Sequence, residues 1–228
     1  MKDILEIIQS RRNITSFLPS FVSWEKVARV LDAARHAPSC GNIQNWKFIV
    51  ILESDLKHRI AQASYEQYDL TNAGVLIIVC GEPETAERYY GLRGERLYTV
   101  QNCAAAIQNM LLEAHSLGLG TTWIGAFDEE EIKSLCSIPD QIRPQAIIAL
   151  GYPREIPQKP PRYPLETLVY FHRWRNRIRD PAKYMNDIAT ILARKTQNAA
   201  EAIRKTSASV VEKTVEKTKE VLRKPKDE

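Results

Sequence analysis

The sequence predicts a layered domain in which helices alternate with strands, of the α/β or α+β class. Two short, apolar, β-branched segments, 47–52 and 75–80, are typical of buried strands. Apolar residues recur at helical spacing in segments 3–10, 23–36 and 97–117. Because each helix and strand must bury its apolar side against another element, this alternation favours stacked layers.

The second half of the chain continues the pattern and then leaves the core. Segments 121–124 and 146–150 predict two more strands, with a short helix over 128–136 between them. The proline-rich segment 151–164 predicts an extended surface arm, because proline lacks a backbone donor and fixes φ. Segment 168–171 is apolar enough for one more strand. An arm followed by a strand suggests a chain that reaches onto another subunit.

The composition excludes several classes of protein. The chain has 228 residues, 44% of them hydrophobic, which is enough to bury a core without disulfides or metals. Its four cysteines are widely spaced and include no Cys-x-x-Cys pair, so they predict buried small side chains rather than a metal site. No apolar run approaches the roughly 20 residues of a membrane span, and the first residues do not resemble a signal peptide. We therefore expect a cytoplasmic protein with no membrane contact.

Basic charge is concentrated at the end of the chain. The formal net charge is +4, and residues 181–228 carry all of this excess. The remainder is formally neutral, which argues against nucleic-acid binding by the body of the protein. We expect residues 175–228 to form a charged tail, helical or partly disordered. A solvated helix without a partner is favoured there over weak contact with an acidic surface or a nucleic acid.

Common cofactor and catalytic signatures are missing. The chain has no Gly-x-Gly-x-x-Gly segment after a predicted strand, so a Rossmann dinucleotide site is not indicated. It also has neither a Walker loop nor a Gly-x-Ser-x-Gly elbow. No pair of histidines has the spacing of metal ligands, so the four histidines are expected at the surface or at helix ends.

Three segments suggest a binding site. Arg11 and Arg12, followed by Asn13, place two guanidinium groups at a helix end, where they could bind a phosphate or simply cap the helix. Segment 38–46, which contains one of the cysteines, offers Ser, Asn and Gln side chains that could read the edge of a heterocycle or form a polar turn. The glycines of segment 118–125 let a backbone N–H approach a flat ring, although a helix cap before a strand would also explain them.

In combination these segments resemble the FMN-dependent nitroreductase family. The resemblance covers residues 1–174 and leaves the tail, 175–228, outside. It is carried by five segments that follow the family's order: Arg11-Arg12-Asn13 with Phe17, the Ala-Ala-Arg to Trp stretch over 33–46, the central helix over 101–120, Trp-Ile-Gly at 123–125, and Gly-Tyr-Pro at 151–153 before the basic residues of 159–162.

The resemblance implies an α+β nitroreductase-like fold, with a mixed central β-sheet flanked by helices and a C-terminal arm exchanged between the subunits of a homodimer. It also implies tightly bound FMN at the subunit interface and NAD(P)H as co-substrate. Nitroaromatics, quinones or a related small acceptor would be reduced by ping-pong hydride transfer. Two different functions remain open: a non-catalytic flavin-binding module tethered by its tail, and a flavin-consuming or dehalogenating member of the same fold.

The same resemblance implies roles for individual residues, and no side-chain acid or base is required among them. Arg11, Arg12 and Arg162, with Lys159 as a weaker candidate, would hold the phosphate and ribityl end of FMN, and Asn13 would also bind the cofactor. The isoalloxazine would be lined by Pro38, Ser39, Asn42 and Gln44, and the backbone at Ile124 and Gly125 would face its N5. The chain departs from the family at three positions, where Asn13 replaces Ser, Thr15 replaces Arg and Asn45 replaces Pro.

Overall fold

The computed structural model describes residues 3–177, apart from the side chain of Tyr68. The chain divides into two units, Met1–Lys159 and Pro160–Glu228, which are described separately. The part of the predicted tail that follows Arg177 lies outside the described residues.

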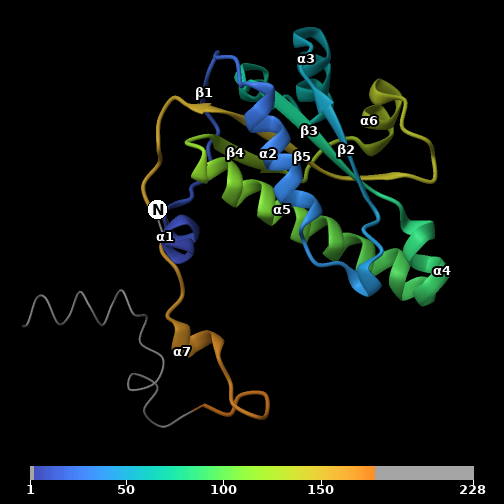
Figure 1. Ribbon diagram of the computed structural model, residues 1–228, viewed down its shortest axis with the longest axis vertical. Helices are drawn as coiled ribbons and strands as arrows, with labels where there is room; N and C mark the ends of the chain where they lie inside the picture. The colour runs from blue at the N-terminus through green and yellow to red at the C-terminus, as the bar shows by residue number, and fades with distance from the viewer. Residues whose placement is uncertain (1–2, 178–228) are drawn as a thin grey trace, which may run out of the picture. The chain divides into compact units, whose positions relative to one another are not determined.

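One sheet forms the centre of the first unit (Figure 1). Its strands are β1 (Phe17–Leu18), β2 (Trp46–Ile51), β3 (Val75–Gly81), β4 (Gly120–Ile124) and β5 (Arg143–Pro153). Strands β5 and β3 are central: β2 pairs with β3, while β4 and β1 pair with β5. All of these pairings are antiparallel. Within residues 3–177, the mixed character expected of the sheet rests on one isolated parallel bridge, between Asn13 and Thr121.

Helices cover both faces of the sheet. They are α1 (Ile4–Ser10), α2 (Trp24–Arg35), α3 (Ser54–Ala63), α4 (Pro83–Arg93), α5 (Thr99–Ser116) and α6 (Glu129–Cys136), with a π-helical turn, η3 (Gly94–Tyr98), before α5 and short 3₁₀ turns η1 (Cys40–Asn42) and η2 (Tyr68–Asn72). Helices α2 and α5 pack together on one face, and α3 and α6 contribute to the core on the other. The result is a three-layer α+β arrangement (Figure 1).

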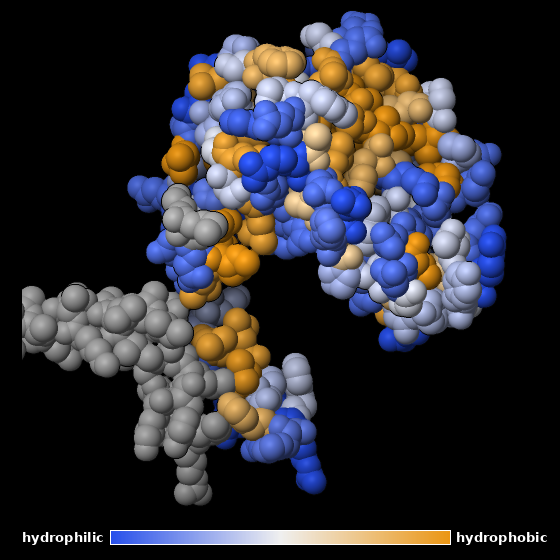
Figure 2. All heavy atoms as spheres, in the orientation of Figure 1, coloured by the Kyte–Doolittle hydropathy of each residue, from blue (hydrophilic) through white to orange (hydrophobic). Residues whose placement is uncertain are grey.

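Strand β3 shows why two cores form. All of its residues are buried, and successive side chains point to opposite faces of the sheet. Val75, Ile77 and Val79 join the core beneath α2 and α5, whereas Leu76 and Ile78 join the core beneath α3 and α6. Strand β2 lies at the edge of the sheet, and apolar side chains reach the visible surface over it (Figure 2).

The strands predicted over 47–52, 75–80, 121–124 and 146–150 and the helix over 128–136 are confirmed, with shifts at their ends. The helix begins after Asp128, whose carboxylate accepts a hydrogen bond from the backbone N–H of Glu131 at 2.9 Å. Helices α3 and α4 and strand β1 were not predicted from the sequence. Among the described residues, no helix combines the length and the apolar character that crossing a bilayer requires.

The strand predicted over 168–171, in the second unit, is wrong. A single helical turn, α7 (Leu165–Leu168), occupies its beginning. The backbone N–H and the hydroxyl of Thr167 both donate to the carbonyl of Pro164, at 3.0 and 2.7 Å. Within the predicted strand, the backbone N–H of Phe171 donates to the carbonyl of Asn176 at 2.8 Å. No described strand pairs with the segment.

Candidate flavin site

The two arginines lie where α1 ends and the chain turns to run beside β4. Arg11 is the first residue after the helix and has extended geometry. The backbone N–H of Ile14 donates to the carbonyl of Thr121 at 3.0 Å, and the Thr122 hydroxyl donates to the carbonyl of Ile14. A Cβ on Gly120 would lie 2.7 Å from the Ile14 side chain, so a glycine is needed for this close approach.

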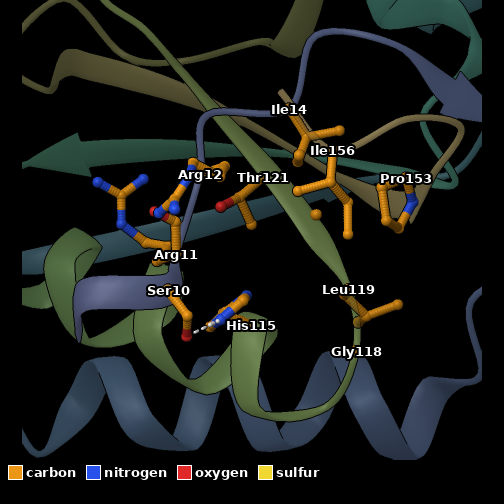
Figure 3. A pocket seen from close by; sticks show the side chains of 11 residues that line it. Ser10, Arg11, Arg12, Ile14, His115, Gly118, Leu119, Thr121, Pro153 and Ile156 are labelled. Carbon is orange, nitrogen blue, oxygen red and sulfur yellow. Dashed lines mark hydrogen bonds between the residues drawn. The ribbon is translucent and has the colours of Figure 1, made fainter. Parts of the chain in front are cut away.

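A pocket of about 160 Å³ opens at this junction (Figure 3). Its lining comes from the end of α1 and the residues after it, the end of α5 and the turn after it, the start of β4, the last residue of β5 and Ile156. Arg11 and Arg12 lie at one end of the pocket, and Ile14, Ile156 and Pro153 at the other (Figure 3). The pocket therefore combines a cationic end with an apolar end.

The nitrogens of the Arg12 guanidinium differ in their hydrogen bonding. Its Nη1 donates to the carbonyls of Gln9 and Arg11, at 2.9 and 2.8 Å. This is the helix capping that the sequence allows in place of phosphate binding. Its Nε, however, is buried and has no hydrogen-bond partner among the described residues. A buried donor without a partner costs about 1–3 kcal/mol, and an anionic oxygen that reached Nε would relieve this cost. The donor set thus fits the phosphate of FMN.

Ser10 and His115 form a second polar contact in the pocket, which was not predicted from the sequence. The Ser10 Oγ lies 2.8 Å from His115 Nε2, across the junction of α1 and α5 (Figure 3). His115 is in the last turn of α5, so the prediction of a helix-end position is confirmed for this histidine. No local pattern marks the pair, because its members are far apart in the sequence.

Residues 38–45 of this segment lie in the loop between α2 and β2, and Trp46 begins β2. Gln44 donates from its backbone N–H to Ser39 Oγ at 3.1 Å and from its side chain to Asn42 Oδ1 at 3.2 Å. The side chains of Pro38, Asn42 and Gln44 are exposed, and Ser39 is half-buried. The four residues predicted to line the isoalloxazine thus lie on one loop, with their polar groups accessible.

These two regions lie at opposite ends of α5 (Figure 1). Asn102, in the first turns of the helix, holds the loop through Cys40, whereas His115, in the last turn, contacts Ser10. Thirteen residues of helix separate them, or about 20 Å at 1.5 Å per residue. One copy of the chain therefore does not bring the arginines and the loop together.

The remaining predicted residues are divided between the two units. Ile124 is buried at the end of β4, and Gly125 follows it on the surface, where a Cβ would meet nothing within 4 Å. Lys159 is exposed at the end of the first unit, and Arg162 is exposed in the second. The predicted roles of Lys159 and Arg162 beside Arg11 stay predictions.

The cysteines behave mainly as small core residues. Cys80 and Cys103 are buried, and burial raises the pKa of each thiol to about 12. All four cysteines are free, and in residues 3–177 no cluster of His, Cys, Asp and Glu could hold a metal. Cys40 and Cys136 are half-buried, and Cys40 differs from the other three in lying in the polar loop.

Comparison with known proteins assigns the family. The nitroreductase family profile matches residues 8–72 and 66–152. A protein of Archaeoglobus fulgidus, named for NADH dehydrogenase and NAD(P)H nitroreductase activity, is 34% identical over 159 residues, which are 68% of this chain and 88% of the relative. An FMN reductase [NAD(P)H] of Bacillus subtilis is 25% identical over 190 residues, 77% of this chain and 76% of the relative.

Solved structures of nitroreductase family proteins are similar to this chain. A nitroreductase family protein of Clostridium difficile 630 matches with a TM-score of 0.67 and 29% identity, covering 76% of this chain and 99% of that one. The chain belongs to the nitroreductase family.

Proposed function

We propose that two copies of this chain bind FMN between them and reduce a nitroaromatic, a quinone or a related small acceptor with NAD(P)H, in a ping-pong reaction. The chain is an NAD(P)H-dependent oxidoreductase of the nitroreductase family, with FMN as its cofactor. The observation that carries the proposal is the pocket that Arg11 and Arg12 line beside the start of β4. The buried Nε of Arg12 has no hydrogen-bond partner among the described residues.

In this proposal the residues of the chain bind and orient the cofactor. Arg11 and Arg12 would hold its phosphate, with the exposed side chain of Asn13 beside the ribityl group. The open space in front of Gly125 would admit the ring against the backbone. When bound, FMN supplies the hydride chemistry, while the protein supplies position, electrostatics and exclusion of water.

A homodimer would complete the site. The loop residues Ser39, Asn42 and Gln44 of one copy would meet the arginine pocket of the other, because a single copy keeps the two regions apart at the ends of α5. Helix α1 supports an interface, since it buries none of its residues and exposes Ile4 and Ile8 at 72% and 47%. Exposed apolar groups of this kind favour contact with another protein surface.

The test is a steady-state kinetic experiment on the purified, FMN-loaded protein. Initial rates are measured while NAD(P)H and a quinone are varied against each other, after anaerobic bleaching of the flavin by NAD(P)H has been established. Parallel double-reciprocal lines are expected, and intersecting lines would contradict the ping-pong order.

Three further results would point to a different function. A flavin that NAD(P)H does not bleach would favour the non-catalytic flavin-binding module. Loss of the flavin during turnover would favour a flavin-consuming enzyme. Release of halide from a halogenated ring would favour a dehalogenating enzyme.

A further inference from the structure

Two asparagines are buried beneath the loop that carries Ser39, Asn42 and Gln44. Asn45 is fully buried and Asn102 is 4% exposed. Asn102 donates from Nδ2 to Asn45 Oδ1 at 2.7 Å, so the two amides form a direct pair. Buried amides need their hydrogen bonds, and each bond between them is strengthened by the low local dielectric.

The amide pair connects the loop to three other segments. Asn45 donates from Nδ2 to the carbonyl of Glu82, after β3, at 2.9 Å and to Thr99 Oγ1, at the start of α5, at 3.0 Å. The Thr99 hydroxyl in turn donates to the carbonyl of Gly94, in η3, at 3.0 Å. The end of the loop is thereby fixed to β3, to the π-helical turn and to α5.

The other side of the pair holds the beginning of the loop. The backbone N–H of Cys40 donates to Asn102 Oδ1 at 3.0 Å, and Asn102 Nδ2 lies 3.3 Å from Cys40 Sγ. Asn102 therefore bonds residues on both sides of positions 41–44, of which Gly41, Asn42 and Gln44 are exposed. Removing its side chain would release Cys40 and Asn45 at the same time.

The loop needs such support because its backbone is unusual. Gly41, Asn42 and Gln44 all have positive φ, at 51°, 57° and 48°. Residues other than glycine adopt this region at a cost, and they keep it only when surrounding contacts determine it. Glycine adopts positive φ without this cost, so position 41 is not strained. The Tyr90 hydroxyl also occupies the space that a Cβ at Gly41 would need.

We propose that Asn45 and Asn102 are positioning residues for the flavin: they hold the loop in the strained conformation that presents Ser39, Asn42 and Gln44 to the ring. The inference rests on the proposed function and deepens it. It also gives a reason for Asn45 at a position where the family resemblance led us to expect proline, since proline has no side-chain amide to make these bonds.

The test compares Asn102→Ala with Asn109→Ala. Asn109 lies on the same helix and also donates from Nδ2, but to the carbonyl of Ala33 in α2 at 3.1 Å, away from the loop. Two quantities are measured: the FMN dissociation constant, and the rate at which iodoacetamide labels Cys40 in the folded, FMN-free protein, located by peptide mass spectrometry.

For Asn102→Ala we expect FMN binding to be weaker by about tenfold or more, because Cys40 and Asn45 both lose a hydrogen-bond partner, and we expect faster labelling of Cys40. Asn109→Ala should change neither quantity. Equal effects of the two variants, or unchanged labelling in Asn102→Ala, would overturn the proposal.

Asn45→Ala and the double variant keep the test decisive if either single variant is unstable. Because the two amides bond each other, their effects on FMN affinity should be less than additive; additive effects would contradict a shared role. If the wild-type protein failed to bind FMN, the proposed function would fall, whereas the labelling of Cys40 would still report whether the amide pair holds the loop.

Discussion

The two regions of the predicted flavin site are built in different ways. The arginine pocket is held mainly by backbone: residues 11–14 run beside β4 through main-chain bonds and through the missing Cβ of Gly120. The loop over 38–46 is held mainly by the side-chain amides of Asn45 and Asn102. The phosphate end therefore depends on close packing and charge, whereas the ring end depends on a few buried hydrogen bonds.

The largest effect is expected from Gly120→Ala. The new Cβ would lie within 3 Å of three atoms of the buried, β-branched Ile14, so residues 11–14 must move away from β4. Overpacking of this kind costs about 1–3 kcal/mol, and the free energy of unfolding should fall accordingly, with loss of FMN binding. Chemical denaturation of the variant measures the first effect and flavin titration the second.

The control is the same substitution in an Ile14→Ala background. With the contact removed, Gly120→Ala should cost much less than it does in the wild-type protein. An equal cost in both backgrounds would mean that the contact with Ile14 is not the reason for the glycine.

Arg12→Ala tests whether charge governs the phosphate end. Hydrogen bonds to charged groups contribute about 1.5–3 kcal/mol, so FMN should bind roughly ten- to a hundredfold more weakly. Riboflavin, which lacks the phosphate, should bind the variant and the wild type almost equally. A similar loss for both ligands, measured by fluorescence titration, would assign Arg12 to the helix cap alone.

Lys57 provides a buried cation outside both regions. It is 9% exposed and donates to the carbonyl of Ala73 at 2.8 Å. Burial lowers the pKa of Lys57 below its ordinary value of 10.5. Between the lowered pKa and 10.5 the unfolded chain binds more protons than the folded one, so folding stability should rise with pH in that window.

The measurement compares the wild type with Lys57→Met. The free energy of unfolding of the wild type, relative to that of the variant, should increase as the pH approaches 10.5 and then level off. Parallel pH profiles would show that burial does not perturb this lysine.

Gly125→Ala should have the smallest effect on stability. Nothing lies within 4 Å of the added Cβ, so the free energy of unfolding should change by less than about 0.5 kcal/mol. FMN affinity should nevertheless fall if the ring approaches this backbone. Unchanged FMN affinity would place the ring elsewhere. It would also show that FMN binding depends on Gly120 but not on Gly125.

The sequence predicted much of the fold because the signals are local. The alternation along β3 and the apolar stripe of α5 follow directly from burial on opposite sides of a strand and on one side of a helix. Helix α4 was missed although it carries a local signal, a proline in its first turn. The strand predicted over 168–171 failed because apolar residues alone do not supply a pairing partner.

The sequence by itself determined the types of group in the candidate site: two arginines at a helix end, a polar loop and a glycine-rich strand start. It also determined the family, through the order of these segments. Only the tertiary structure decided that the arginines and the loop lie at opposite ends of α5 and that Asn45 pairs with Asn102. The physical reason is that these contacts join residues 57 to 105 positions apart, and such contacts form only when packing brings distant segments together.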